Sequence, residues 1–492
     1  MFEGLRYATT TPVSEPGIVG DLSAVRRVHL IAISGVAMTS LAGMLKSRGL
    51  EVRGSDQNVY PPASTLLERL GVPVRIGYRP ENLDPAPDLV VVGNAVSRTN
   101  PEVAAMLERG LPFISMADAI RRFFLAGKRS LVVAGTHGKT TSTAMLAWVL
   151  VSAGRDPSLM VGGEALDFGG NFRLGKGQDF VIEGDEYDTA FFDKGPKFLH
   201  YQPRGLILTA VEFDHADIYR DLDQVKAAFV KLLKIVPHGA PVLACTDFPQ
   251  TEETVRESGR SVERFGLAPS ASWRAVDVRD EGARTRFTVR FDGGAEAELA
   301  IPPMGEMNVR NALGVFALCR RLGLSATDIR PGLESFRGVR RRQEVIREEP
   351  VIVIDDFAHH PTAIAGTLEA VRRRYPGRKL WAVFEPRSNT SRRRTFQKEF
   401  AEALRGADAA VVASVFFKET DPLPESDRLS VSRIVEDLRV AGREAETLPD
   451  NDAILEHLGR SVRPGDVVVF MSNGSFGGLP WRFAEATGTL RH

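Results

Sequence analysis

Residues 131–154 read LVVAGTHGKTTSTAMLAWVLVSAG, and they decide how the middle of this chain folds. An apolar, strand-like run leads into a glycine-rich turn at 135–141, and an apolar helical run follows. Glycines let backbone N–H groups close around phosphate oxygens, the helix start adds positive potential, and Lys139 supplies a charge for the β- and γ-phosphates. The Thr140 hydroxyl is then the natural ligand of Mg²⁺. The turn therefore predicts an ATP site, although the strict pattern would have glycine at Val133; a plain glycine turn before a helix is the alternative.

Two acidic clusters follow the next strand-like runs. The first, EGDEYD at 183–188, continues the run FVIEG, and the second, EFDHAD at 212–217, follows LILTAV at 206–211. Because parallel strands end at the same edge of a sheet, these carboxylates can converge on a hard cation beside the phosphate turn. Solvated acidic loops are the alternative for either cluster taken alone.

The alternation of strand-like and helical runs predicts an α/β fold with three domains. It begins at Val28 with VHLIAI, restarts at Leu131 and begins a third time with VIVID at Val351. Short alternating runs at 258–300 predict a small antiparallel sheet. We therefore expect a Rossmann-like domain (1–124), a central P-loop ATPase domain with a mostly parallel sheet plus the antiparallel one (125–332), and a C-terminal Rossmann-like domain (333–492).

Composition narrows the class of protein. The 492 residues fit about three domains of ordinary size, and 63 basic residues balance 63 acidic ones, so no bulk attraction to nucleic acid or anionic membranes is expected. No apolar run approaches the roughly 18 to 20 residues of a membrane span, and the first residues do not resemble a signal peptide. Cys245 and Cys319 lie in apolar contexts and are predicted to be buried thiols. These features predict an ordinary globular protein of the cytoplasm.

Three other segments follow strand-like runs. AISGVAM at 32–38 stands where a dinucleotide fingerprint would lie, but most of its glycines are replaced. It supports a nucleotide-binding type of fold with a pyrophosphate at the helix end, and it argues against NAD. DDFAHHP at 355–361 and EPRSNT at 385–390 place histidines, Arg387 and Asn389 at strand ends. Ligand contact is one interpretation; helix capping or solvent exposure is the other.

The order of these segments resembles the Mur ligases, enzymes that build or repair peptidoglycan precursors by ATP-driven amide bond formation. GTHGKTT, the two acidic clusters, GEMNVRNAL, the arginines at 340–342 and DDFAHHPT occur in the family's order, and the resemblance runs from Val28 to about Leu490. It implies that a carboxylate attacks the γ-phosphate of ATP to give an acyl phosphate, which an amine then attacks.

Further segments resemble one branch of the family, which joins UDP-N-acetylmuramate to the recycled tripeptide L-Ala-γ-D-Glu-meso-diaminopimelate. They are EGDEYDTAFFDKGPKF at 183–198, FEPRSNT at 384–390 and MSNGSFGG at 471–478. The branch that adds L-alanine to the same nucleotide sugar typically has DESDASF and an HRYSRT-like segment at the first two places, and it is the alternative. Diaminopimelate or lysine as the third peptide residue stays open. An NAD-type oxidoreductase or a plain ATPase fits less well.

The resemblance also implies cofactors, namely ATP and Mg²⁺, and roles for individual residues. The implied catalytic residues are Lys139, Glu186 and His215, and the metal would be placed by Thr140, Glu186 and His215. ATP would be bound by the phosphate turn and by an adenosine side, consisting of Gly135, Thr136, His137, Gly138, Lys139, Thr140, Thr141, Asn308, Asn311, Arg342 and Asp356. The UDP-sugar would meet Ser34, Gly35, Asp56, Asn94 and Ser97. Contacts to the peptide would come from Phe357, His359, His360, Arg387, Ser388 and Asn389.

Three positions depart from the family pattern. Met307 replaces a histidine that usually precedes the adenine-side asparagine, and Ala210 replaces a common asparagine. Phe229 stands where several peptide-adding relatives carry a carbamylated lysine. Lys139, Glu186 and His215 keep the family pattern.

Overall fold

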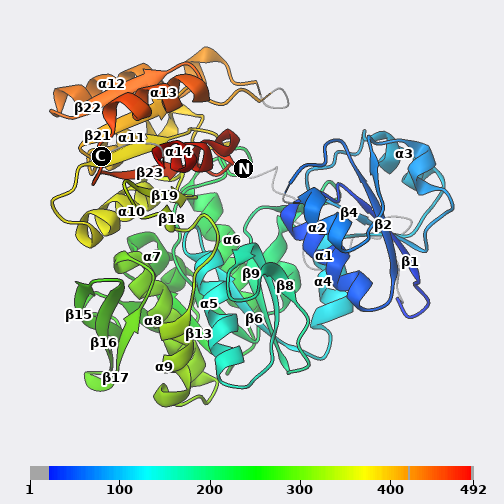
Figure 1. The fold of residues 1–492 in the computed structure, drawn as a ribbon. Helices are drawn as coiled ribbons and strands as arrows, with labels where there is room; N and C mark the ends of the chain where they lie inside the picture. Colours follow the sequence, from blue (N-terminus) through cyan, green and yellow to red (C-terminus); the bar gives the residue numbers. More distant parts are fainter. Residues whose placement is uncertain (1–21, 62, 419–421, 489–492) are drawn as a thin grey trace, which may run out of the picture. The chain divides into compact units, whose positions relative to one another are not determined.

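The structure is a computed structural model that describes residues 22–61, 63–418 and 422–488. Its α/β character confirms the expected fold class (Figure 1). The described chain forms two compact units. The first contains the residues up to Glu212, Asp223–Ala271 and Gly314–Gly332, and the second contains Phe213–Leu222, Ser272–Leu313 and the residues from Leu333 onward. The domain boundaries expected near residues 125 and 333 stay a prediction.

The N-terminal part of the first unit is a five-stranded parallel sheet with the order β3-β2-β1-β4-β5. Its strands are β1 Arg27–Ile31, β2 Glu51–Asp56, β3 Val74–Ile76, β4 Leu89–Val92 and β5 Phe113–Ser115, and its helices are α1 Val36–Ser47, α2 Ala63–Arg69, α3 Pro101–Glu108 and α4 Met116–Ile120. The order reverses between β1 and β4, and the loops after these two strands form the crevice where such sheets bind ligands. The expected Rossmann-like arrangement is therefore present.

A second sheet of the first unit carries the phosphate turn. Its order is β14-β13-β12-β6-β9-β7-β8, with only β8 antiparallel to its neighbour among the registered pairs. The strands are β6 Arg129–Ala134, β7 Ser158–Ala165, β8 Gly170–Arg173, β9 Asp179–Gly184, β12 Gly205–Leu208, β13 Val242–Cys245 and β14 Glu263–Gly266. Helices α5 Lys139–Ser152 and α7 Pro249–Ser258 pack against strands of this sheet, and α6 Leu222–Ile235 lies between β12 and β13 in the sequence. The strand expected at 206–211 ends early, because the Ala210 carbonyl oxygen accepts a bond from the N–H of Thr136 (2.7 Å) and so serves the phosphate turn.

The expected antiparallel sheet is present but shorter than the predicted range of 258–300. It consists of β15 Trp273–Glu281, β16 Arg284–Phe291 and β17 Gly294–Ile301, in the second unit. The residues before it end α7 and form β14, which pairs in parallel with β13. A further hairpin joins β10 Asp188–Ala190 to β11 Asp193–Pro196. Two helices follow the antiparallel strands, α8 Gly305–Arg321 and α9 Ala326–Ser335.

The C-terminal sheet of the second unit has the order β18-β19-β23-β20-β21-β22, in which only the edge strand β18 is antiparallel. The strands are β18 Glu344–Arg347, β19 Ile352–Asp356, β20 Leu380–Phe384, β21 Ala409–Ala413, β22 Glu444–Leu448 and β23 Val467–Met471. Ile352 and Ile354 join a core with α10 Pro361–Arg374, α11 Gln397–Leu404 and α12 Val431–Val440. Val351 and Val353 join another with α13 Asn451–Ser461 and α14 Leu479–Thr487. Apolar residues on alternate positions thus bury both faces of the sheet.

Short helical turns complete the described chain: η1 Pro80–Leu83, the π-helical turn η2 Arg121–Leu125, η3 Lys197–Tyr201, η4 Arg394–Phe396, η5 Glu425–Asp427 and η6 Phe476–Gly478. Across the described ranges, no helix has both the length and the apolar character that a bilayer crossing requires. Cys245 and Cys319 are buried free thiols, as expected.

The core of the first unit explains one departure from the family pattern. Phe229, on α6, has no exposed surface, and its ring centroid lies 5.4 Å from that of Phe198. The aromatic ring therefore has a packing role at this position.

We expect Phe229→Ala to lower the free energy of unfolding by about 3–5 kcal/mol, because it removes a buried aromatic ring and leaves a cavity. Urea unfolding followed by circular dichroism measures the loss. Phe417→Ala is the matched control, since Phe417 is 65% exposed and its removal should cost no more than about 0.5 kcal/mol. Equal losses for the two variants would contradict the packing role of Phe229.

Candidate active site

The phosphate turn is held by backbone geometry that only glycine allows. Gly135 has φ of 135°, and a Cβ atom there would lie 2.3 Å from the Thr209 hydroxyl oxygen. Gly138 has φ of 77° and precedes the first residue of α5, Lys139. The turn therefore packs directly against the chain that leaves β12, and it stands at the start of a helix, where phosphate groups bind in proteins.

Lys139 and Glu186 form a buried ion pair in this turn. Their side chains are 11% and 2% exposed, and the Lys139 Nζ lies 2.8 Å from Glu186 Oε2 and 2.5 Å from the Gly135 carbonyl oxygen. Burial lowers the pKa of Lys139, but the negative charges of Glu186 and Asp185 outweigh it and raise the pKa above its usual value. The ammonium is therefore charged and ready to meet an anion.

Glu183, the first residue of the predicted acidic cluster at 183–188, adds a second carboxylate beside the phosphate turn. It accepts a hydrogen bond from the Thr140 hydroxyl (2.9 Å) and one from the backbone N–H of Gly162 (2.7 Å). Burial, together with the charge of Asp185, raises the pKa of Glu183. Carboxylate and hydroxyl oxygens are what Mg²⁺ prefers, and a cation would relieve the repulsion among the acids, so this set of residues fits the metal that the family resemblance implies.

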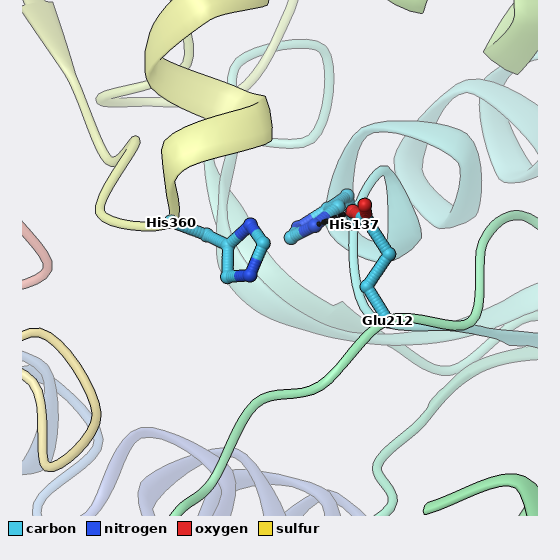
Figure 2. Close-up of side chains that lie close together, drawn as sticks. All are labelled: His137, Glu212 and His360. Carbon is cyan, nitrogen blue, oxygen red and sulfur yellow. Dashed lines mark ion pairs between the residues drawn. The ribbon is translucent and has the colours of Figure 1, made fainter. Parts of the chain in front are cut away.

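His137 and Glu212 form a second pair at the turn. The His137 Nε2 lies 2.6 Å from Glu212 Oε2, and Figure 2 shows the two side chains directed at each other. The Thr136 hydroxyl accepts a bond from the Glu212 N–H (2.9 Å). Glu212, the first residue of the second acidic cluster, therefore connects the chain after β12 to the phosphate turn.

The residues expected at the UDP-sugar lie at the carboxyl edge of the N-terminal sheet. Asp56, the last residue of β2, accepts the backbone N–H of Ser34 (2.8 Å), and Gly35 precedes α1 with an exposed backbone. Asn94 and Ser97 follow β4 and are exposed. The structure thus brings the loops after β1, β2 and β4 to one edge, as the strand order requires.

The expected adenine-side asparagines of the second unit form a chain of amide bonds. Asn308 donates to the Met304 carbonyl oxygen (2.9 Å) and to the Gln343 side-chain oxygen (3.0 Å), while Asn311 donates to the Asn308 oxygen (3.1 Å). Both asparagines are buried on the first half of α8. Gln343 is a contact that the sequence analysis missed. Met307 meanwhile packs its sulfur against Gly366, where a Cβ would come within 2.5 Å.

Asp356 organises the loop after β19. It accepts backbone N–H bonds from Gln343 (2.7 Å) and Ala358 (2.6 Å), and burial raises its pKa. Arg342 lies 4.0 Å from the centre of the Phe357 ring, a stacked arrangement that fixes the guanidinium. The expected ribose-side acid and its arginine therefore come from neighbouring segments of one sheet edge.

His215 belongs to the second unit and has φ of 55°, in the left-handed region. Its neighbour Asp214 lies 3.8 Å from the Nε2 of His359, whose Nδ1 donates to the Phe357 carbonyl oxygen (2.9 Å). Burial opposes ionisation of Asp214, but the nearby His359 and His215 side chains favour the charged carboxylate and hold the pKa of Asp214 well below its usual value. Asp214 also accepts the backbone N–H of His215 (2.7 Å), which anchors the strained backbone of that residue.

The remaining expected peptide contacts have defined partners in the second unit. His360 caps α10 by accepting the Thr362 N–H (3.3 Å), and Figure 2 shows it at the start of that helix. Arg387 stacks 3.8 Å from the Phe416 ring centre. Ser388 is buried and bonds Ser391 within its own turn, whereas Asn389 accepts from Lys418 (3.0 Å) and donates to Asp217 (2.7 Å). Lys418 is another contact without a signal in the sequence.

Three family models match successive parts of the chain. They describe the Mur ligase family catalytic domain at residues 27–127, the Mur ligase middle domain at 133–319, and the Mur ligase glutamate ligase domain at 341–474.

Two curated relatives and one solved structure match nearly the whole chain. The chain is 38% identical, over 92% of its length and 96% of the relative's, to UDP-N-acetylmuramate–L-alanyl-γ-D-glutamyl-meso-2,6-diaminoheptandioate ligase of Escherichia coli K12. It is 34% identical, over 94% of its length and 99% of the relative's, to UDP-N-acetylmuramate–L-alanine ligase of Paraburkholderia phytofirmans. The crystal structure of a murein peptide ligase from Psychrobacter arcticus superposes with a TM-score of 0.69 at 34% identity, covering 94% of this chain and 99% of that one.

The buried pair of Lys139 and Glu186 predicts a specific pattern of stability. Glu186→Gln should lower the free energy of unfolding by about 3–5 kcal/mol, because it leaves a buried ammonium without its counter-charge. The double variant Lys139→Met/Glu186→Gln should recover much of that loss, since no charge then stays unpaired. Urea unfolding without nucleotide measures both. Additive losses in the double variant would show that the two side chains do not interact.

Proposed function

This chain belongs to the Mur ligase family, and we propose that it uses Mg-ATP to join UDP-N-acetylmuramate to the tripeptide L-Ala-γ-D-Glu-meso-diaminopimelate through a new amide bond. The carrying observation is the charged, buried Lys139 at the start of α5, paired with Glu186. An ammonium held in this way can exchange its carboxylate partner for phosphate oxygens as ATP arrives. The Escherichia coli relative at 38% identity, whose name gives these two substrates, supports the choice.

Lys139 acts in the first step by binding the β- and γ-phosphates, where negative charge builds up as the sugar's lactyl carboxylate attacks the terminal phosphorus. The N–H groups of the phosphate turn share that charge, because they are fixed before the reaction begins. Mg²⁺, held by Thr140, Glu186 and His215, with Glu183 bonded to Thr140, would supply further neutralisation when bound. ADP leaves, and the sugar carboxyl is now an acyl phosphate.

The second step requires the peptide amine to attack the acyl phosphate, so that the C–N bond forms, the amine proton is lost and phosphate leaves. Arg387, Asn389 and the loop at 357–360 are the proposed peptide contacts, since a carboxylate-rich tripeptide calls for cationic and amide partners. Ser388 is the remaining proposed peptide contact. Its hydroxyl bonds Ser391 and so stabilises the turn that carries Arg387 and Asn389.

The proposed contacts to ATP and to the UDP-sugar follow the roles that the family resemblance implies. Asn308 and Asn311 would meet adenine, Asp356 the ribose, and Arg342, fixed on the Phe357 ring, the phosphates. The loops that carry Ser34, Gly35, Asp56, Asn94 and Ser97 would receive the UDP-sugar at the crevice between β1 and β4. We place the reaction in the cytoplasm, where ATP is available.

A second candidate is the ligase that adds L-alanine to the same nucleotide sugar, favoured by the relative of that name at 34% identity. Both reactions share the sugar carboxylate and ATP, and they differ only in the amine. The choice of amine therefore decides between them.

The decisive assay mixes the protein with Mg-ATP and UDP-N-acetylmuramate and measures phosphate release after adding either tripeptide or L-alanine. We expect release with the tripeptide, together with a product that mass spectrometry identifies as the amide. Release with alanine alone would select the second candidate, and release without any amine would indicate a plain ATPase.

Lys139→Ala should reduce ligation by roughly a hundred- to a thousandfold, because a preorganised charge at the transferred phosphoryl group is lost. Lys379→Ala is the matched control, since Lys379 pairs with Glu444 at the surface (2.7 Å) and should leave turnover unchanged. Circular dichroism checks that both variants fold. Full turnover in Lys139→Ala would remove the phosphate turn from the mechanism.

A further inference from the structure

A cavity of about 830 Å³ in the first unit has a lining rich in arginine. Arg26, Arg48, Arg121 and Arg122 all contribute to its wall, together with Phe123 and Gln202. The described residues that line it include no aspartate or glutamate. Its volume lies in the range that holds nucleotide-sized ligands.

The cavity lies at the opposite edge of the N-terminal sheet from the expected UDP-sugar site. Arg26 directly precedes β1, and Arg48 lies in the turn between α1 and β2, so both are at the amino ends of parallel strands. Ser34 and Asp56 stand at the carboxyl ends of the same strands. The five residues of β1 separate the two edges by about 16 Å, at 3.3 Å per residue.

The positive charge of the cavity is only partly compensated. Asp118 pairs with Arg122 (2.6 Å) and Arg121 (2.9 Å to its Nε), so one carboxylate serves two guanidinium groups. The Arg26 guanidinium donates to carbonyl oxygens of its own turn, at Ser23 (2.8 Å) and Val25 (2.9 Å). A carbonyl oxygen is a dipole and does not neutralise the cation.

Arg48 is the fourth arginine of the lining. The Arg48 guanidinium lies 5.5 Å from the ring centre of Phe124, and both Arg26 and Arg48 are exposed. Nearby Asp88 is engaged by the side chain of Arg27 (3.0 Å), which does not line the cavity. Arg121 and Arg122 of the lining share the carboxylate of Asp118. Asp88 also accepts the backbone N–H of Arg26 (3.0 Å), and the exposed Glu51 directly follows Leu50 of the lining.

The backbone supports a binding role. Arg121, Arg122 and Phe123 lie in η2, a π-helical turn, and three consecutive residues of this turn line the cavity. Such turns are rare and occur frequently at functional sites. The dipole of α1 accounts for a basic residue at Arg48, but it does not account for the arginines that come from η2 and from the start of β1.

We propose that this cavity binds a phosphorylated small molecule, separate from the substrates of the ligation reaction. Guanidinium groups bind phosphate oxygens in pairs of parallel hydrogen bonds, and several around one cavity suit a polyphosphate better than a single carboxylate. The ring of Phe123 and the amide of Gln202 add apolar and hydrogen-bonding surface for the rest of the ligand.

The test is protection of individual arginines from phenylglyoxal by sodium tripolyphosphate, read residue by residue by mass spectrometry on the whole protein at 0.1 M salt. We expect saturable protection of Arg26 and Arg48. Arg433 is the matched control, because it is exposed, pairs with Asp437 on α12 and lies outside the cavity. Arg48→Gln should raise the tripolyphosphate concentration that half-protects Arg26 by about tenfold, since a charge-assisted contact is lost.

Arg48→Gln should also retain the melting temperature and ligase turnover of the unchanged protein, because Arg48 is at the surface and contacts no residue of the phosphate turn. Equal protection of Arg433 would mean that tripolyphosphate acts as a general electrolyte and would overturn the proposal. Absence of protection at Arg26 and Arg48, or protection of Arg26 that Arg48→Gln leaves unchanged, would overturn it too.

Discussion

The buried positive charge of Lys139 requires a carboxylate partner beside the phosphate turn. The Lys139 ammonium is almost fully removed from water, and an unpaired charge in that position would cost several kcal/mol. Glu186 offsets the cost only because it follows β9, which pairs in parallel with β6, so that both side chains leave the sheet at the same edge. The parallel register of two strands therefore determines whether the phosphate turn can hold its cation at all.

The same constraint shapes the backbone around the turn. Gly135 approaches Thr209 and Ala210 so closely that a side chain would collide with them, and the chain after β12 consequently bonds the turn instead of extending its strand. Glu212 continues this contact through Thr136. Three adjacent strands, β12, β6 and β9, thus each end in a segment that contacts the phosphate turn, which leaves the turn little freedom to rearrange when phosphate binds.

Local patterns in the sequence predicted the parts of the site that are contiguous in the chain. Gly135 to Thr141 could be assigned because a strand, a glycine turn and a helix start follow one another directly. Glu183 and Glu186 are three residues apart, and no local pattern says which of them bonds Thr140 and which pairs with Lys139, since that depends on the pairing of β9 with β6. Lys418 and Gln343 were missed for the same reason. They meet Asn389 and Asn308 across 29 and 35 residues of sequence.

The balance of 63 basic and 63 acidic residues conceals two different local uses of positive charge. At the phosphate turn, carboxylates surround Lys139 and keep its ammonium charged in the absence of ligand. When phosphate groups bind the ammonium, the same carboxylates can pair with other cations. Such an arrangement suits a reaction in which charge moves. Around the cavity at the amino edge of the N-terminal sheet, Arg121 and Arg122, two of the four lining arginines, share the carboxylate of Asp118. Arginine stays charged without such help, so this arrangement suits stationary binding of an anion and offers no group for proton transfer.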